Sequence, residues 1–292
     1  VKDRAAYAMI EAAETSGKDI DIALFSAGGE TSKRFAPVAA EKGIVVIDNS
    51  AAWRFEDDIP LVVPEVNPQD IAKYKNRGII ANPNCSTIQA VVALKPLADK
   101  YGLERVIYST YQAVSGAGVR GFEDLKGGIC GEPPQKFPYP IAGNCLPHID
   151  VFFDDGYTKE EMKMIWETRK IMGLPDLRVT ATTVRVPVYY GHSESINVEL
   201  KKPFEVDEVR ALLASAPGVV VQDDPKNLVY PMPINAEDKD EVFVGRIRRD
   251  YSVENGLNLW VVADNIRKGA ATNTVQIAET LMKMWENGEI AR

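Results

Sequence analysis

Short apolar runs and stretches of helical spacing alternate along the first hundred residues. Strands are predicted at 21–26, 43–48 and 78–81, with a helix at 31–41 between the first two. The first strand ends in the turn Ser26-Ala27-Gly28-Gly29. A strand, a glycine-rich turn, a helix and a second strand, in this order, are typical of the βαβ unit of a parallel sheet. We therefore expect an α/β fold in this part of the chain.

Beyond residue 105 the pattern is dominated by strands. They are predicted at 105–114, 179–188, 195–200, 219–221, 241–248 and 257–263. Helices are expected at 158–172 and 206–214, and a long amphipathic helix at 269–286 closes the pattern. The proline-rich stretch 133–140 is expected to be a loop, because proline disrupts a helix interior. Since strands outnumber helices, this part predicts an α+β domain with a mixed or antiparallel sheet.

Composition and charge narrow the class of protein. The 292 residues predict two domains or one large one. Hydrophobic residues make up 45% and charged residues 26% of the chain, which excludes wholesale disorder. The net charge of −8 argues against nucleic-acid binding through bulk charge, so any anion must be held by a few local cations.

The three cysteines, Cys85, Cys130 and Cys145, are too few for a disulfide framework and contain no C-x-x-C pair. No metal site is therefore expected, and reduced thiols favour a cytoplasmic protein. No apolar run is long enough for a membrane span, and no signal peptide is recognisable. Cys130 and Cys145 have no setting that indicates reactivity, and we interpret both as structural or incidental.

Cys85 is the sharpest chemical feature. It follows the third predicted strand and precedes a stretch of helical apolar spacing at 86–100, with Asn84 or Ser86 as a candidate N-cap. A thiol at a helix N-terminus meets the positive end of the helix dipole, which favours the nucleophilic thiolate. A buried, inert cysteine is the alternative, and spacing alone leaves both interpretations open.

Histidine is scarce, because the chain has only His148 and His192. His192 follows Gly191 at a predicted strand end, which gives the ring room to face a cleft. Its ordinary pKa near 6.5 suits a proton shuttle for a cysteine nucleophile. A histidine that makes one structural hydrogen bond is the alternative, and we prefer that interpretation for His148.

Two arginines are candidates for anion binding. Arg185 lies seven residues before His192, so a continuous strand would place the two side chains on opposite faces, although Pro187 and Gly191 weaken that expectation. Arg54 lies in the loop after the second strand, at the carboxyl end of the parallel sheet, where ligands bind. A solvated ion pair is the alternative for both arginines.

Two further features are weaker. Glu160 and Lys163 are one turn apart on a predicted helix, so they could simply pair with each other. The turn from Ser115 to Gly118 follows a strand and offers backbone N–H groups to a ligand.

The order of several sequence motifs carries a family resemblance. The motifs are Phe25-Ser-Ala-Gly-Gly29, Val45-Val-Ile-Asp-Asn-Ser50, Pro60-Leu-Val-Val-Pro-Glu-Val-Asn67, Asn82-Pro-Asn-Cys-Ser-Thr87, Tyr111-Gln-Ala-Val-Ser-Gly-Ala-Gly118, Gly156-Tyr-Thr-Lys-Glu-Glu-Met-Lys163, Arg185-Val-Pro-Val, Gly191-His192 and Ala263-Asp-Asn-Ile-Arg-Lys-Gly-Ala-Ala271. Together they resemble the bacterial aspartate-β-semialdehyde dehydrogenases over essentially the whole chain.

The resemblance implies an oxidoreductase that uses NADPH to reduce L-aspartyl-4-phosphate to aspartate semialdehyde, with release of phosphate. This reaction belongs to the biosynthesis of lysine through diaminopimelate, and of methionine and threonine. The resemblance also implies a small-molecule substrate, no nucleic acid or membrane partner, and a homodimer or tetramer.

The resemblance assigns a role to each candidate residue. Cys85 would carry the acyl group as a thioester, His192 would be the general acid/base, and Gln112 would orient the acyl intermediate. The substrate would be bound by Arg185 at its α-carboxylate, Glu160 at its amino group, Arg54 and Lys163 at its phosphate, and Asn84 beside the nucleophile. The cofactor would contact Ser26, Ala27 and Gly28, with Ser115, Gly116 and Asn265 near the nicotinamide.

The family pattern also predicts the domains. Residues 1–83 and 270–292 would form a Rossmann-like NADP-binding domain, and 84–269 a catalytic and dimerisation domain. Family members begin with a strand and a G-x-x-G-x-x-G turn that binds pyrophosphate, and nothing here matches it. We therefore expect the first βαβ unit to be missing. Residues 1–18 are expected to be a short, partly helical segment.

Three alternatives remain at this point. A related acyl-phosphate reductase, of the N-acetyl-glutamyl-phosphate or glyceraldehyde-phosphate type, would share the chemistry, although the motifs fit it less well. A truncated, non-catalytic dimerisation partner would bind no NADPH. A thiol hydrolase that uses Cys85 and His192 would act without a cofactor.

Overall fold

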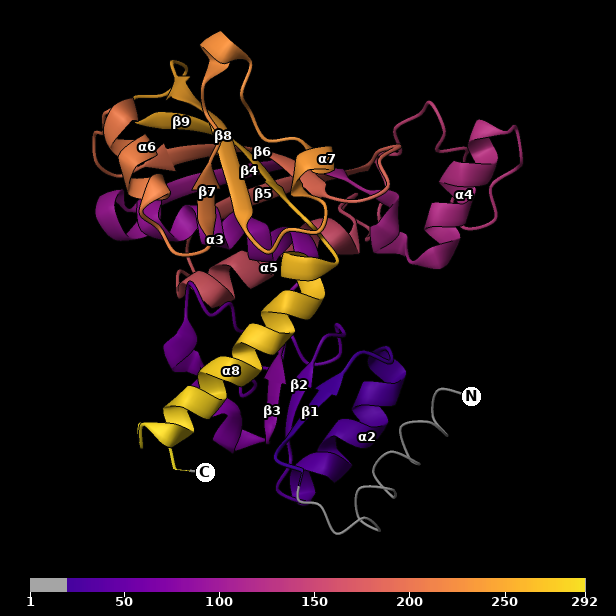
Figure 1. Cartoon of the computed structure of the whole chain (residues 1–292), viewed down its shortest axis with the longest axis vertical. Coiled ribbons are helices and arrows are strands. Elements are labelled where there is room, and N and C mark those ends of the chain that lie inside the picture. The colour runs from indigo at the N-terminus through magenta and orange to yellow at the C-terminus, as the bar shows by residue number, and fades with distance from the viewer. Residues whose placement is uncertain (1–19, 292) are drawn as a thin grey trace. The chain divides into compact units, whose positions relative to one another are not determined.

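The computed structural model describes residues 20–291, which form two compact units. One unit contains the described residues up to Asn84 together with the chain from Ala270, and the other runs from Cys85 to Gly269. Figure 1 traces both along the chain. The partly helical segment predicted at 1–18 lies outside the described residues.

The first unit is built on a parallel sheet in the order β1-β2-β3. Its strands are β1 (Ile22–Phe25), β2 (Val45–Asp48) and β3 (Ile79–Ala81), and the chain between β1 and β2 forms helix α2 (Gly29–Glu41). A 3₁₀ segment, Pro68–Asn76, precedes β3. The βαβ unit predicted from the sequence is therefore confirmed.

Helix α8 (Thr272–Glu286) completes this unit. Its Ile277 and Leu281 are fully buried and pack with Val45 and Ile47 of β2 in one hydrophobic core. The predicted helix start at residue 269 is wrong, because the chain from Arg267 to Ala271 forms a π-helical turn and regular α-helix begins only at Thr272.

The second unit is built on a six-stranded sheet in the order β5-β4-β6-β9-β8-β7. Its strands are β4 (Leu103–Gln112), β5 (Arg178–Arg185), β6 (His192–Leu200), β7 (Val219–Val221), β8 (Val242–Asp250) and β9 (Gly256–Ala263). The β4–β5 and β7–β8 pairs are parallel and the other pairs are antiparallel, so the predicted mixed sheet is confirmed.

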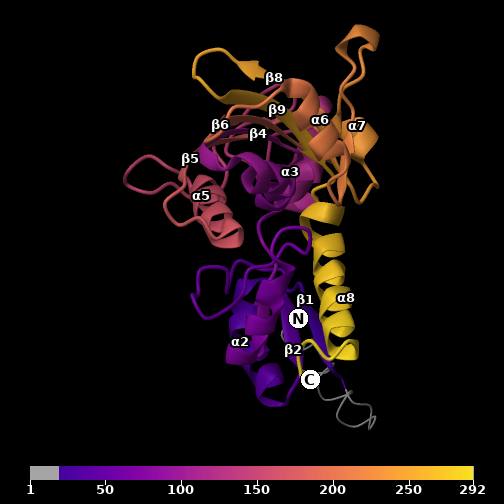
Figure 2. The ribbon, with the colours of Figure 1, turned by 90° about the vertical axis from the view of Figure 1, so that its left-hand side faces the viewer.

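Helices α3 (Cys85–Tyr101), α5 (Lys159–Met172) and α6 (Val206–Ala214) pack on one face of this sheet. Ala236 of the short α7 (Pro233–Ala236) packs with Phe243 and Val262, and α4 (Val119–Ile129) contacts the segment Val114–Ala117. Figure 2 shows α3 and α5 on the same side of the strands. Along β4 every second residue from Val106 to Gln112 is buried, which follows from the alternation of side chains in a strand that is covered on one face.

Candidate active site

Three polar side chains meet where strands of the six-stranded sheet end. Gln112 is the last residue of β4 and is paired with Arg185, the last residue of β5. His192 is the first residue of the antiparallel neighbour β6, one position beyond the pair formed by Ser193 and Tyr111. Since β4 lies between the other two strands, the register of the sheet places all three residues at the same end of these strands.

The expectation that Arg185 and His192 lie on opposite faces is wrong. Strand β5 ends at Arg185 and β6 begins at His192, so the six residues between them are a connection rather than a strand. Period two does not run through that connection. Both side chains instead approach Gly116, where an added Cβ would lie 3.0 Å from Arg185 Nη1 and 3.2 Å from His192 Cε1.

The His192 ring is held by the backbone. Its Nδ1 accepts a hydrogen bond from the Ala113 N–H at 3.0 Å, so the neutral ring carries its proton on Nε2. That Nε2 has no hydrogen-bond partner among the described residues, and it lies 3.3 Å from the Cβ position of Gly116. Complete burial, with a smaller effect of the Arg185 charge, lowers the pKa of His192 well below 6.5. The ring is therefore a neutral donor directed into the site.

Arg185 is the second donor. Its side chain is buried, and its Nη1 donates to the Ala113 carbonyl at 2.6 Å, while its Nε has no hydrogen-bond partner among the described residues. Burial lowers the pKa of Arg185, and the charges of Glu160 and Cys85 oppose that effect. The guanidinium thus lies within electrostatic reach of both the candidate nucleophile and the candidate amine-binding carboxylate.

Cys85 is the first residue of α3 rather than the residue before the helix, and it is partly buried. Asn84 precedes the helix directly. A close neighbour is Gly269, because a Cβ at that residue would lie 2.8 Å from the Cys85 Cβ. A side chain there would therefore collide with the nucleophile, which fits the irregular π-helical turn at this point of the chain.

Glu160 lies in the first turn of α5 and Lys163 at the start of the second, and both are buried. Lys163 Nζ donates to Glu160 Oε2 at 3.0 Å and Gln112 Nε2 donates to Glu160 Oε1 at 3.3 Å, so the predicted Glu160–Lys163 pair is confirmed. Lys163 also pairs with Asp150 at 2.7 Å. Burial lowers the pKa of Lys163, but the two carboxylates outweigh it and the net shift is upward.

Ser115 and Asn265 form hydrogen bonds with each other near the same end of the strands. The Ser115 hydroxyl and the Asn265 amide lie 3.1–3.2 Å apart, and Asn265 Oδ1 also accepts from the Gly191 N–H at 3.0 Å. Both side chains are buried. Asn265 therefore fixes the position of the backbone next to His192.

The remaining candidate residues lie in the first unit. Ser26, Ala27 and Gly28 link β1 to α2, and Gly28 has a φ of 95°, which favours glycine. Among the described residues, no atom lies within 4 Å of a Cβ built on Gly28, at the N-terminus of α2. A glycine turn at a helix N-terminus suits a phosphate-bearing cofactor. Arg54 is buried, and its Nη2 donates to the Asn49 carbonyl at 3.3 Å.

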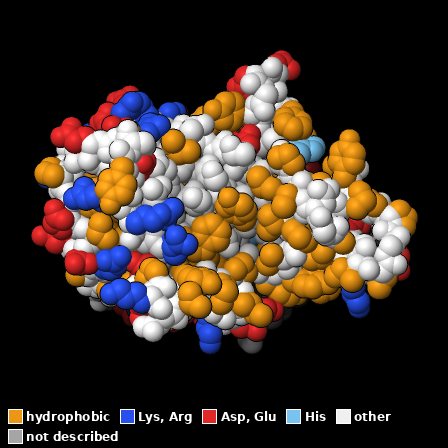
Figure 3. All heavy atoms as spheres, turned by 90° about the horizontal axis from the view of Figure 1, so that it is seen from above, with side chains coloured by type: hydrophobic (Ala, Val, Ile, Leu, Met, Phe, Trp, Pro, Cys, Tyr) orange, Lys and Arg blue, Asp and Glu red, His pale blue; other side chains and the backbone are white. Residues whose placement is uncertain are grey.

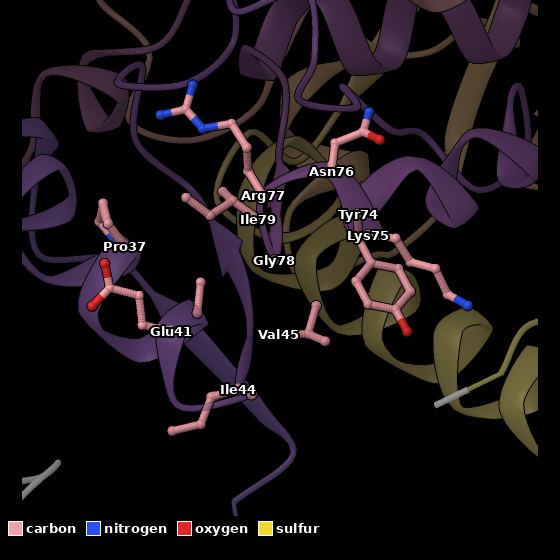
Figure 4. A pocket seen from close by; sticks show the side chains of 12 residues that line it. Pro37, Glu41, Ile44, Val45, Tyr74, Lys75, Asn76, Arg77, Gly78 and Ile79 are labelled. Carbon is pink, nitrogen blue, oxygen red and sulfur yellow. The ribbon is translucent and has the colours of Figure 1, made fainter.

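A hollow in the first unit is a different feature. It has a volume of about 600 Å³ and is lined by residues such as Ile44, Tyr74, Arg77 and Ile79 (Figure 4). It lies where β2 and β3 begin, whereas ligands of parallel α/β sheets bind beyond the carboxyl ends of the strands. None of the predicted site residues lines it.

Sequence reasoning missed three residues around the site. Gln89 lies one turn after Cys85 in α3, Asp150 binds Lys163, and Glu194 lies two residues after His192 in β6. Gln89 and Glu194 are completely buried. A polar residue within the apolar run of α3 was a signal that the sequence offered for Gln89.

Several features lie outside the site. His148 stacks on Phe152, with ring centroids 4.4 Å apart. Cys130 and Cys145 are exposed, and none of the three cysteines forms a disulfide. Within residues 20–291, no helix is long and apolar enough to cross a membrane. No group of three or more metal-binding side chains is found in the same range.

Comparison with known proteins places this site in a family. The family model described as semialdehyde dehydrogenase, NAD binding domain matches residues 2–74, and the one described as semialdehyde dehydrogenase, dimerisation domain matches residues 94–268. A curated aspartate-semialdehyde dehydrogenase from Aquifex aeolicus is 64% identical over 277 residues, which are 92% of this chain and 82% of the relative.

Solved structures agree. Aspartate semialdehyde dehydrogenase II from Vibrio cholerae, complexed with ASA, matches with a TM-score of 0.87 at 53% identity and covers 90% of this chain and 80% of its own. Aspartate semialdehyde dehydrogenase with NADP from Candida albicans matches with a TM-score of 0.72 at 28% identity, covering 90% of this chain and 77% of its own.

The matches to both domain models define the chain as a semialdehyde dehydrogenase. Within that class, the chain belongs to the aspartate-semialdehyde dehydrogenase family, as the sequence motifs indicated.

Proposed function

We propose that this chain catalyses the NADPH-dependent reduction of L-aspartyl-4-phosphate to L-aspartate 4-semialdehyde and phosphate, a step in the synthesis of lysine, methionine and threonine. The observation that carries the proposal is the convergence of Arg185 and His192 on Gly116, with Arg185 in electrostatic reach of Cys85. The names of the relatives support the choice of substrate.

The two units have different roles, cofactor binding and catalysis. The unit with β1, β2 and β3 binds NADP, with Ser26, Ala27 and Gly28 at the phosphates. The unit from Cys85 to Gly269 holds the chemistry, and Ser115, Gly116 and Asn265 adjoin the nicotinamide. NADPH, when bound, supplies the hydride. The Candida albicans relative has NADP in its structure, which supports this assignment.

The substrate is recognised by buried charges. Arg185 binds the α-carboxylate through its planar fork, and Glu160 binds the α-ammonium group. Lys163 and Arg54 bind the phosphate, and Asn84 and Gln112 orient the reacting acyl group. Because the chain is acidic overall, these few cations must provide the attraction that the anion needs.

The Cys85 thiolate attacks the acyl carbon, the bond from that carbon to the phosphate oxygen breaks, and phosphate leaves with the electron pair. The acyl group is then a thioester on Cys85. The hydride that NADPH would supply reduces the thioester; the C–S bond then breaks, its electron pair returns to Cys85 as the thiolate, and the aldehyde leaves. In both stages His192 Nε2–H donates a hydrogen bond to the acyl oxygen, which stabilises the negative charge that develops there.

A free amino group distinguishes this substrate from its nearest rival. An N-acetylated acyl phosphate carries no positive charge, so it offers the buried Glu160 carboxylate no ion pair, whereas the free ammonium group of the aspartyl compound adds one to the existing pair with Lys163. Glu160 therefore favours aspartyl phosphate over the N-acetyl-glutamyl type.

The functional molecule is a homodimer, or a tetramer built from it, in the cytoplasm. The face of the six-stranded sheet opposite α3 and α5 is covered only in part, by α7 and the chain before it, and Figure 3 shows hydrophobic side chains gathered on part of the surface. Tyr111 and Trp260 lie on that face with ring centroids 5.5 Å apart. The free cysteines are consistent with a reducing compartment.

Cys85→Ser tests the proposal against a matched control, Cys130→Ser. We expect Cys85→Ser to fold normally and to lose activity on the order of 10³-fold or more, because a serine hydroxyl is a far weaker nucleophile than a thiolate. Cys130 is exposed on the molecule, so its variant keeps full activity. The assay is phosphate-dependent NADP reduction with aspartate semialdehyde, and N-acetylglutamate semialdehyde is the comparison substrate. Near-normal turnover in Cys85→Ser, or a preference for the N-acetylated aldehyde, would refute the proposal.

A further inference from the structure

The candidate nucleophile and the candidate acid/base histidine lie on two different secondary-structure elements, and catalysis requires that these elements keep a fixed relative position. Cys85 begins α3, whereas His192 begins β6, and 106 positions of sequence separate the two residues. The reaction needs the sulfur and the imidazole held at a fixed separation, because small displacements of catalytic groups reduce the rate strongly. The elements themselves provide no covalent or backbone link at this point.

Gln89 provides a link by hydrogen bonding. It lies four residues after Cys85, so its side chain projects from the same face of α3, one turn further along. Its Nε2 donates to the His192 backbone carbonyl at 3.3 Å. The helix that carries the thiol is thereby bonded to the residue that carries the imidazole.

The burial of Gln89 indicates that this bond has a purpose. The side chain is completely buried within an otherwise apolar stretch of α3, and its Oε1 has no hydrogen-bond partner among the described residues. A buried amide with an unsatisfied oxygen costs stability, and an apolar residue of the same shape would avoid that cost. Fold stability alone therefore does not explain a glutamine at this position.

The other bonds to this segment show what Gln89 adds. The Ala113 N–H fixes the His192 ring, and Asn265 Oδ1 fixes the N–H of Gly191. Neither bond involves α3. Among the hydrogen bonds described for this segment, the one from Gln89 joins it to the helix of the nucleophile.

We propose that Gln89 is a positioning residue, which sets the separation of Cys85 and His192 by bonding α3 to the His192 carbonyl. The proposal rests on the proposed function for the roles of those two residues. Gln89 touches no reacting atom itself, so it acts through the placement of the other two.

A double-mutant cycle tests this coupling. Gln89→Leu removes the donor but keeps the approximate volume, and we expect kcat to fall about 10- to 100-fold with little change in KM. In a His192→Ala background the same substitution should change kcat by less than about twofold, because the partner being positioned is gone. An equal loss in both backgrounds would overturn the proposal.

A spectroscopic measurement makes the test independent of the substrate. The chain has only two histidines, so a ¹⁵N-histidine NMR spectrum contains one signal set for His192 and one for His148, which serves as the internal control. We expect Gln89→Leu to shift or broaden the His192 signals and to leave those of His148 unchanged. Unchanged His192 signals would overturn the proposal even if the proposed substrate were wrong.

Control variants separate positioning from stability. Tyr101→Phe removes a hydrogen bond to Glu208 at the other end of α3, so it should lower the melting temperature and leave kcat unchanged. If Gln89→Leu does not fold, Gln89→Met keeps the unbranched shape and allows the same measurements. A kcat that follows only the fraction of folded protein, as in Tyr101→Phe, would show that Gln89 is merely structural.

Discussion

At the scale of single residues, Gly116 is the point where Arg185 and His192 meet. A methyl group there would lie 3.0 Å from the guanidinium and 3.2 Å from the imidazole, so both side chains would have to move. We expect Gly116→Ala to lower kcat/KM by about 10-fold or more, because displacement of either donor weakens the binding of the reacting acyl group. Steady-state kinetics with aspartate semialdehyde and phosphate measure the effect. Unchanged kcat/KM would show that the space at Gly116 is not part of the site.

A second residue, Glu194, gives the protein a pH-dependent stability. Its carboxylate is completely buried and has no hydrogen-bond partner among the described residues. Burial, with a smaller effect of the nearby Glu160, raises its pKa well above 4.5. The folded protein therefore keeps a proton that the unfolded chain loses above about pH 4.5, so this group costs stability progressively as the pH rises through that window.

The lowered pKa of His192 changes the stability in the opposite direction and over a different pH range. Its pKa is lowered by burial, so the unfolded chain takes up a proton below pH 6.5 that the folded protein refuses, and stability falls as the pH decreases. The two effects oppose each other between pH 4.5 and 6.5, and above pH 6.5 only that of Glu194 remains. We expect Glu194→Gln to gain stability over the parent by up to about 1.4 kcal/mol for each pH unit above 6.5, in urea unfolding between pH 6.5 and 8.5. A difference that is independent of pH would contradict an uncharged Glu194.

At the scale of secondary-structure elements, the start of α5 fixes two side chains of the site. The Thr158 hydroxyl accepts from the Glu161 N–H, and the Glu161 carboxylate accepts from the Thr158 N–H, which is a complete capping box. Glu160 lies within that first turn, and Lys163 follows at the start of the second. Substitution of Thr158 by alanine should therefore lower the free energy of unfolding by about 1 kcal/mol and raise the KM for the aldehyde.

The matched control is the N-terminus of α6. Its N-cap residue, Glu205, makes no capping hydrogen bond, so Glu205→Ala should change stability by less than about 0.5 kcal/mol and leave KM unaltered. Chemical denaturation and steady-state kinetics on both variants provide the comparison. Equal effects of the two substitutions would mean that the capping box has no role in the site.

Elements with a strong period were predictable, and irregular ones were not. Helix α6 begins and ends at the predicted residues, and β7 does the same. Helix α4 escaped prediction because Gly121, Gly127 and Gly128 weaken its helical signal. The late start of α8 depends on the approach of Gly269 to Cys85, which is a tertiary contact with no local signature.

The same distinction between local and tertiary causes applies to the residues of the site. Cys85 and His192 could be identified as candidates from their neighbours in the sequence, because a thiol at a helix start and a histidine after glycine have local causes. The meeting of His192 and Arg185 could not, since it depends on where β5 ends and β6 begins. The donor that fixes the ring, the Ala113 N–H, belongs to the backbone and has no side-chain signature at all.

At the scale of the whole molecule, the exposed part of the sheet face opposite α3 and α5 predicts the assembly. Tyr111 is 40% exposed in the central part of that face, and an arginine there would place a charge in the proposed dimer interface. We expect Tyr111→Arg to shift the protein towards monomer in sedimentation-velocity experiments. Trp166→Arg on α5, where the tryptophan is equally exposed at 40% on the helix side, should leave the dimer intact. Dissociation by the second variant alone would place the interface on the other side.

The two carboxylates around Lys163 have a consequence for how anions are attracted. Asp150 and Glu160 place two negative charges beside its single ammonium charge, so these three side chains present no excess positive potential to bulk water. An arriving anion gains little there from long-range attraction and must instead replace a carboxylate at close range. Binding of an anion at Lys163 therefore resembles ligand exchange more than electrostatic steering. Added salt should lower the rate of anion binding only slightly.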